Sequence, residues 1–123
     1  MNLSIKRKRL LSLNRELNKY LEELMMRKPL MKGSLYELRS KCGKANCRCT
    51  RGELHKAMVL SWSEKGKHRI RTVGMGELYR IRELTKNYQR FRNGRAGVSR
   101  IARQIQEIAD EIEKELLKMG RKK

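Results

Sequence analysis

The chain has 123 residues, of which 38% are hydrophobic, 5% aromatic and 37% charged, and its formal net charge at pH 7 is +19. This length corresponds to one small domain or module, whose limited core calls for a metal, a partner or self-association. No apolar run reaches about 18 residues and no secretory leader pattern is present, so we expect a cytoplasmic protein without a membrane span.

The N-terminal segment, residues 3–28, has the spacing of an amphipathic helix. Its apolar residues recur in steps of three and four, which places them on one stripe. They are Leu10, Leu13, Leu17, Tyr20 and Leu24. We expect this helix to end at Lys28, because the residue before Pro29 is disfavoured in helical geometry.

The central segment changes to the period of a strand. Residues 57–63 and 68–73 alternate apolar and polar side chains, and the Glu64–Lys67 segment between them contains Gly66, a residue suited to a left-handed turn. The pattern predicts a β-hairpin, with residues 35–39 as a candidate third strand.

Helical periodicity returns after Gly76 and continues almost to the end of the chain. One apolar stripe comprises Ile81, Leu84, Tyr88 and Phe91, and a second comprises Val98, Ile101, Ile105, Ile108, Ile112, Leu116 and Met119. Gly94 and Gly97 lie between the stripes, so residues 77–119 form either one bent helix or two helices. The predicted fold class is α+β, organised as an N-terminal helix (1–32), a Cys/His loop with a basic hairpin (33–76) and a basic helical region (77–123).

The narrow stripes of the first and last helical segments resemble coiled-coil seams. They can pair with each other within one chain or with the same helices of a second copy. The basic run Lys6–Arg9 would lie beside the acidic stretch 107–115 if the two segments packed antiparallel. The alternative is that both runs are solvent-exposed helix faces, which is the more common situation for charged runs on helices.

The motif that points to specific chemistry is C-x4-C-x-C-x5-H, formed by Cys42, Cys47, Cys49 and His55. Three cysteines and one histidine are a common ligand set for structural zinc, although the x4 and x1 spacings differ from the usual C-x2-C. We expect a structural Zn²⁺, with Cys47 and Cys49 pointing the same way from an extended segment. The alternatives are three incidental thiols beside a surface histidine, or, less favoured, a catalytic or redox-active cysteine.

The sequence resembles a small, poorly characterised prokaryotic domain family over residues 33–92. The resemblance rests on Gly33-Ser34-Leu35, on Cys42-Gly43-Lys44-Ala45-Asn46-Cys47-Arg48-Cys49, on Arg51-Gly52-Glu53-Leu54-His55 and on Tyr88-Gln89-Arg90-Phe91-Arg92. Members of that family have a "CGKxxCxC…H" box, a short basic hairpin and a long helix, and often occur near mobile genetic elements. The resemblance implies a nucleic-acid-associated role and supports the metal box, but it implies no reaction.

Basic side chains are distributed along the whole chain, which indicates a folded body that a polyanion would neutralise. One group of basic side chains lies on the hairpin turn and its return strand, and a second lies in the metal loop. A third lies on a helix face with cations four residues apart. The predicted contact residues are Lys44, Arg48, Arg51, Lys65, Lys67, Arg69, Arg71, Arg82, Lys86, Arg90, Arg92 and Arg95.

These observations favour a nucleic-acid-binding protein that acts mainly through phosphate contacts and is not an enzyme. DNA is slightly favoured over RNA on the family resemblance. The alternative is an accessory subunit that docks a recombinase, a transposase or another nucleoprotein partner through its helical seams, or forms a homodimer through them. The aromatic side chains are expected mainly in the core, with Tyr79 as the best candidate for stacking on bases.

Overall fold

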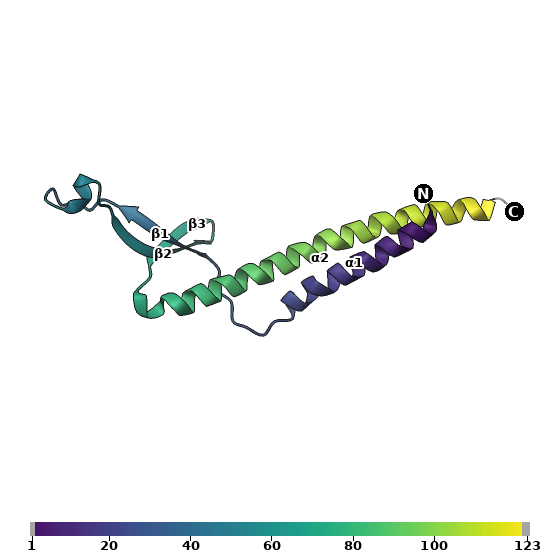
Figure 1. The fold of residues 1–123 in the computed structure, drawn as a ribbon, viewed down its shortest axis with the longest axis horizontal. Helices are drawn as coiled ribbons and strands as arrows, with labels where there is room; N and C mark the ends of the chain where they lie inside the picture. Colours follow the sequence, from purple (N-terminus) through teal and green to yellow (C-terminus); the bar gives the residue numbers. More distant parts are fainter. Residues whose placement is uncertain (1, 122–123) are drawn as a thin grey trace. The chain divides into compact units, whose positions relative to one another are not determined.

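The computed structural model describes residues 2–121 and shows an α+β fold, as the sequence predicts (Figure 1). An N-terminal helix is followed by a three-stranded antiparallel sheet of order β1-β2-β3 and a long C-terminal helix. The elements in chain order are α1 (Leu3–Leu24), β1 (Ser34–Ser40), the 3-10 helix η1 (Arg48–Arg51), β2 (His55–Glu64), β3 (Lys67–Thr72) and α2 (Met75–Arg121).

The chain forms two compact units. Residues 28–89 contain the sheet and the first turns of α2, and we call them the sheet unit. The described residues before 28 and after 89 contain α1 and the rest of α2, and we call them the helix-pair unit. The helix is continuous through Gly94 and Gly97, so of the two alternatives that the sequence left open for residues 77–119, the structure has one helix and not two.

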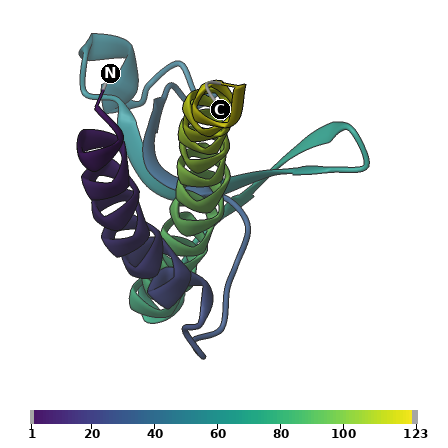
Figure 2. The ribbon, with the colours of Figure 1, turned by 90° about the vertical axis from the view of Figure 1, so that its right-hand side faces the viewer.

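In the helix-pair unit, α1 runs antiparallel to the C-terminal part of α2, and Figure 2 shows the two side by side. The direction follows from the contacts, because Tyr20 hydrogen-bonds Arg100 whereas Lys6 lies beside Glu111. Most of the two predicted stripes pack against each other, with Leu13 and Ile101 almost completely buried, but Leu116 and Met119 at the end of the second stripe are exposed. Asn2 caps the start of α1 by accepting a hydrogen bond from the backbone N–H of Ser4 at 2.9 Å.

The basic run 6–9 and the acidic stretch 107–115 pair at one position. Lys6 is only 6% exposed, and its Nζ lies 3.6 Å from an Oε of Glu111. The prediction that both charged runs are merely solvated is therefore wrong at Lys6, although Arg7, Lys8 and Arg9 are exposed. The long lysine side chain covers apolar surface with its methylenes while its ammonium group reaches the carboxylate.

Gly94 and Gly97 lie where α2 packs closely on α1, next to Tyr20. A Cβ atom added at Gly94 would lie 2.9 Å from Cβ of Glu23 and 3.1 Å from the backbone oxygen of Tyr20. A Cβ at Gly97 would overlap the Tyr20 ring itself. The glycines thus provide room for the neighbouring helix, and the guanidinium of Arg100 lies 5.4 Å from the centroid of the same ring.

We expect Gly97→Ala to destabilise the helix pair by about 1–3 kcal/mol, because overpacking against the Tyr20 ring outweighs the ~1 kcal/mol gain in helix propensity. Gly76→Ala is the matched control, since a Cβ there meets no atom within 4 Å. Urea unfolding followed by circular dichroism measures both. Equal effects of the two substitutions would contradict this account of Gly97.

The connector between α1 and β1 begins earlier than the sequence predicts, because α1 ends at Leu24 and not at Lys28. Within the sheet unit, the connector is attached to α2 by two hydrogen bonds. The backbone N–H of Met31 donates to the carbonyl of Leu84 at 3.1 Å, and the side-chain amide of Asn87 donates to the carbonyl of Pro29 at 3.2 Å. These contacts hold the connector in an extended path, which is incompatible with continuing the helix from Leu24 to Lys28.

The sheet confirms the predicted hairpin and its third strand. β2 and β3 are joined at Lys65 and Gly66, both with positive φ (+51° and +79°), as a tight hairpin turn between right-twisted strands requires. One face of the sheet packs on the first turns of α2 around Leu60, Val73 and Ile81.

The N-terminus of α2 is capped by Glu77. Its carboxylate accepts hydrogen bonds from Arg71 at 2.8 Å and from the Gly74 N–H at 3.3 Å. These bonds lower the pKa of Glu77.

The register assigns every charged side chain of the strands to one face. Directly opposed residues share a face, and Leu35, Leu60 and Arg71 are opposed across the sheet. The charged residues on this helix-facing side are Glu37, Arg39, Lys56, Glu64, Lys67, Arg69 and Arg71. The other face carries none.

Candidate metal centre and basic surface

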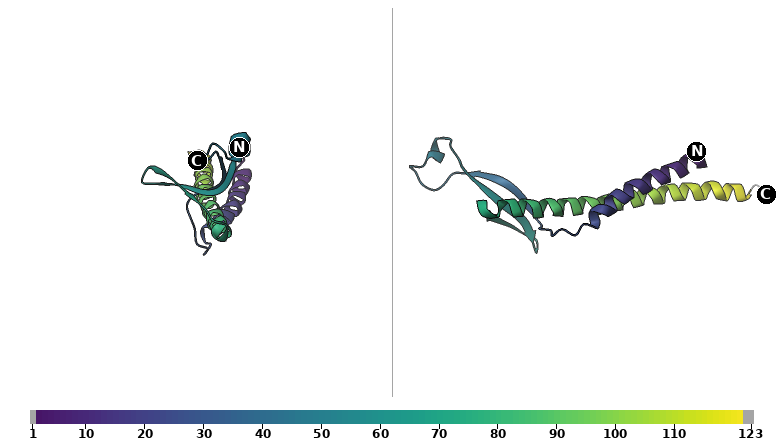
Figure 3. Two further views of the ribbon diagram at one scale, coloured as in Figure 1. Left: turned by 90° about the vertical axis from the view of Figure 1, so that its left-hand side faces the viewer. Right: turned by 60° about the horizontal axis from the view of Figure 1, so that its bottom comes forward.

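The four predicted metal ligands lie in or beside the loop that connects β1 to β2, at one end of the sheet (Figure 3). The antiparallel pairing places Ser40 opposite His55, so the chain leaves the sheet just before Cys42 and re-enters it at the histidine. The loop is therefore closed at its base by backbone pairing. This closure brings the histidine back to the cysteines, as the sequence predicts.

Cys47 and Cys49 are presented by a 3-10 turn and not by an extended segment, so that prediction is wrong. Cys47 is the N-cap of η1, and its carbonyl accepts a hydrogen bond from the Thr50 hydroxyl at 2.7 Å. Gly52 ends the turn with φ of +97°, a conformation that glycine adopts without a Cβ penalty. The tight turn rotates Cys49 inward, where it is fully buried.

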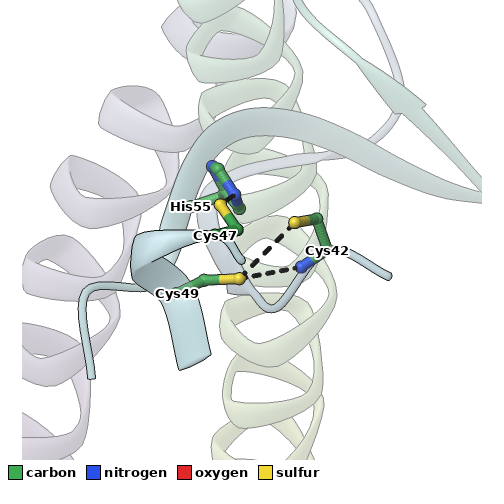
Figure 4. A group of neighbouring side chains, drawn as sticks. All are labelled: Cys42, Cys47, Cys49 and His55. Atoms are coloured by element: carbon green, nitrogen blue, oxygen red, sulfur yellow. Dashed lines mark hydrogen bonds between the residues drawn. The ribbon is translucent and has the colours of Figure 1, made fainter. Parts of the chain in front are cut away.

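The four ligand atoms converge on one point (Figure 4), and all lie within 4.8 Å of one another. Sγ of Cys42 lies 3.5 Å from Sγ of Cys49, and Sγ of Cys47 lies 3.0 Å from Nε2 of His55. Two sulfurs of a tetrahedral zinc site are separated by ~3.8 Å, given Zn–S bonds of ~2.3 Å. These side chains could therefore hold one metal ion with only small shifts.

The electrostatics of the cluster favour a thiolate at Cys47, whose pKa is lowered to about 6. The largest cause is a hydrogen bond from the backbone N–H of Cys49, followed by one from the thiol of Cys42. Amide and thiol donors stabilise the charged form of the acceptor. Cys47 is thus prepared to bind a cation at neutral pH.

The pKa of Cys42 is shifted in the opposite direction, because the neighbouring sulfurs disfavour a second negative charge. The backbone N–H of Lys44 lowers the pKa of Cys42, but hydrogen bonds with the side chains of Cys47 and Cys49, together with burial, outweigh it, so the pKa of Cys42 is raised above its ordinary range. A second thiolate beside the first is unfavourable unless a cation lies between them. The backbone N–H of Cys42 also donates to Sγ of Cys49 at 3.3 Å, an outer contact typical of metal-bound thiolates.

The ligand set determines what this arrangement can do. Cys42, Cys47 and Cys49 form no disulfide with one another. Three cysteines and one histidine complete a tetrahedron, which is the pattern of closed structural sites, whereas catalytic zinc sites keep a coordination position open. A bound ion would cross-link the two ends of the long loop.

All twelve predicted nucleic-acid contact residues are exposed, but the structure divides them into two groups. Arg69, Arg71 and Arg90 form ion pairs with Glu64, Glu77 and Glu23, at 3.9, 2.8 and 3.0 Å. Within the described part of the chain, the others have no ion pair. They are Lys44, Arg48 and Arg51 in the metal loop, Lys65 and Lys67 at the hairpin turn, Arg82 and Lys86 early in α2, and Arg92 and Arg95 in the helix-pair unit.

Arg82 and Lys86 line an open cleft in the sheet unit that sequence reasoning missed. The cleft has a volume of about 360 Å³ and is also lined by Gly33, Ser34 and Leu35. Thr85 also lines the cleft. Its spacing of three residues from Arg82 places the two on one helix face, so the sequence could have identified Thr85. The β1 side of the cleft has no signal in the sequence, because only the tertiary fold brings Gly33 to α2.

Tyr79 is 76% exposed, so the prediction of a core position is wrong for this tyrosine. By contrast, Tyr88 and Phe91 are half-buried on the α2 stripe, as expected. The exposed ring of Tyr79 remains available for stacking.

A family profile described as "Domain of unknown function (DUF6788)" matches residues 7–83. The chain is a member of the DUF6788 family. This agrees with the expected poorly characterised family, and the matched segment contains most of α1, the metal loop, the hairpin and the start of α2.

No curated protein and no solved structure shows significant similarity to this DUF6788 protein. Among its described residues, neither helix combines the length and the apolar character needed to cross a bilayer.

Proposed function

We propose that this DUF6788 protein binds nucleic acid through phosphate contacts, with a structural zinc ion organising part of the binding surface. The observation that carries the proposal is the set of exposed, unpaired cations in the sheet unit, in a chain of net charge +19. Phosphates are the counter-charges that such cations attract most strongly in a cell.

Zinc is the proposed ion because three thiolates and one imidazole suit it better than Mg²⁺ or Ca²⁺, which prefer oxygen ligands. Cys42, Cys47, Cys49 and His55 would hold it. The ion would keep Lys44, Arg48 and Arg51, which lie between or beside the ligands, in a defined arrangement. Reduced thiols of this kind are typical of the cytoplasm, where we propose that the protein acts.

The hairpin supplies the second group of contacts. Lys65 and Lys67 lie at its turn, and a two-stranded ribbon has the dimensions to enter the major groove of DNA. Arg69 and Arg71 already have carboxylate partners, so we assign the main contacts to the unpaired lysines.

DNA is the preferred ligand on the family resemblance, which also suggests a role as an accessory factor of mobile genetic elements. The proposed activity is binding, and no chemical reaction is assigned to this protein. The titration that tests the proposal therefore includes both DNA and RNA.

The test is a titration of fluorescent duplex DNA, single-stranded DNA and duplex RNA with purified protein, measured by anisotropy. The double variant Arg82→Glu/Lys86→Glu is expected to weaken binding at least tenfold, because it removes two phosphate contacts and introduces repulsion. The double variant Lys8→Glu/Lys19→Glu is the control, since it changes the net charge equally at exposed positions of α1. Equal losses in the two variants would refute a localised binding surface, and wild-type protein that binds none of the three ligands would refute the proposal.

A scaffold is the second candidate function, and exposed apolar residues near the end of α2 favour it. Leu116, Leu117 and Met119 are 47%, 52% and 59% exposed. Such residues are suited to docking a protein partner such as a recombinase or transposase. In that case the Arg82→Glu/Lys86→Glu variant would retain partner binding.

A further inference from the structure

The first turns of α2 carry two large side chains that are left out of the core. Met75 is 84% exposed and Tyr79 is 76% exposed. They are four residues apart, so they lie on the same side of the helix. The apolar contacts between this part of α2 and the sheet are made instead by Leu78 and Ile81. The helix therefore holds the ring of Tyr79 in a position that is open to solvent.

Two unpaired cations continue the same side of α2. Arg82 and Lys86 follow Tyr79 by three and seven residues, and these spacings keep all three side chains on one helix face. Both cations are exposed, and in the part of the chain that the structure describes neither forms an ion pair, not even with nearby Glu83. The face thus presents an open aromatic ring followed by two charges that lack a counter-charge.

The spacing of these side chains suits one strand of nucleic acid. Tyr79 and Lys86 are separated by about 10 Å along the helix axis, and Arg82 and Lys86 by about 6 Å, at a rise of about 1.5 Å per residue. Cations this close together can contact phosphates of one strand, while the ring beside them stacks on a base of that strand. A base in a double helix has both faces covered by its neighbours, whereas a base of a single strand can be splayed out onto an aromatic side chain.

The cleft beside Arg82 and Lys86 also favours a single strand. Its volume is about 360 Å³, and its lining includes Ser34, an exposed residue of the edge strand β1. A double helix, whose major groove alone is about 12 Å wide, can only lie across the mouth of such a cleft, where the exposed cations still reach its phosphates. A single strand can enter the cleft with its backbone and bring a base to the ring of Tyr79.

We propose that this face of α2 is a binding site for single-stranded nucleic acid, with a base stacked on Tyr79 and the adjoining phosphates on Arg82 and Lys86. The inference rests on the proposed function and names the class of nucleic acid that this surface takes. Lys65 and Lys67 at the hairpin turn remain the contacts for a duplex. An acidic protein segment would also neutralise the cations, but it would offer Tyr79 no base to stack on.

The test is an anisotropy titration of the zinc-loaded full chain with four kinds of fluorescent ligand of about 12 nucleotides. They are single-stranded DNA, single-stranded RNA, a strand of the same length that lacks its bases, and a duplex of the same length. Tyr79→Ala should weaken binding of a single strand with bases by about tenfold, because one stacking contact is lost. It should leave the affinities for the baseless strand and the duplex unchanged.

Two further variants isolate the role of the ring. Tyr79→Phe keeps the aromatic face and should retain wild-type affinity for the single strand. Tyr36→Ala is the matched control, because it removes a partly exposed tyrosine from the sheet face that points away from α2 and should leave the affinity unchanged. Circular dichroism verifies that each variant is folded.

The proposal is overturned if Tyr79→Ala has no effect on the single strand, or if it weakens the baseless strand or the duplex equally. An equal loss in Tyr36→Ala would overturn it too. A fluorescent polyglutamate peptide whose binding depends on Tyr79 as strongly as that of the strand would point to an acidic protein partner instead. Wild-type protein that binds the duplex but no single strand would refute this inference alone, whereas protein that binds none of the nucleic acids would also refute the proposed function.

Discussion

Replacement of Cys49 by serine is expected to lower zinc affinity by roughly 100-fold or more, because four ligands share a binding free energy of about 10–16 kcal/mol. Cys49 is the fully buried ligand, and it also accepts the hydrogen bond from the Cys42 backbone. Its loss therefore removes a metal bond and an outer contact at once. Without the ion, loop residues 41–54 should lose their defined conformation while β2 and β3 remain paired.

Competition with a chromophoric chelator measures the affinity, and backbone NMR reports the loop. Asn46→Ser is the matched control, because Asn46 is exposed in the same loop and is not a ligand. The metal assignment fails if the wild-type protein purified from zinc-containing medium carries no zinc, or if Cys49→Ser retains wild-type affinity.

The same site should bind zinc more weakly as pH falls, because protons compete for the thiolates. Cys42, whose pKa is raised above its ordinary range, must release a proton on binding at neutral pH. Cys47, with its pKa of about 6, is already ionised there and begins to compete only near pH 6. Zinc affinity should therefore fall steadily as the pH is lowered through neutrality, where Cys42 must lose its proton, and more steeply below about pH 6, where Cys47 is also protonated. A pH-independent affinity would contradict the thiolate assignment.

Nucleic-acid affinity is expected to fall several hundred-fold between about 50 and 200 mM salt if at least five cations contact phosphates, since the logarithmic slope for duplex DNA is about −0.9 per contact. The sheet unit alone contains more unpaired cations than this, in the metal loop, the hairpin turn and the first turns of α2.

Anisotropy titrations at four salt concentrations give the slope. The Arg82→Glu/Lys86→Glu variant should lower the magnitude of the slope by the equivalent of about two phosphate contacts, whereas the Lys8→Glu/Lys19→Glu control should leave the slope unchanged. An affinity that is flat across this range would exclude a phosphate-dominated mode, even if some binding remained.

Side-chain spacing predicted most of the secondary structure, since helices and strands are marked by periods that involve only near neighbours. The metal ligands were predictable for the same reason, because Cys42 to His55 lie close together in the chain. The η1 turn was missed, since the x1 spacing fits both an extended strand and a tight turn. The end of α1 was also missed, because its position depends on contacts of Pro29 and Met31 with α2.

The sequence by itself determined the element types, the hairpin turn at Gly66 and the four ligands, because each depends on local backbone preference or short spacing. Only the tertiary structure decided which cations are neutralised. Arg90 pairs with Glu23 across a long separation in the chain, and no local pattern distinguishes it from unpaired Arg82 or Lys86. The sequence raised the pairing of the basic run 6–9 with the acidic stretch 107–115 as one alternative, but only the packed helices select Lys6 and Glu111. The placement of all the charged strand residues on one face of the sheet likewise required the strand register, because alternation in one strand does not specify which residues of its neighbours share a face.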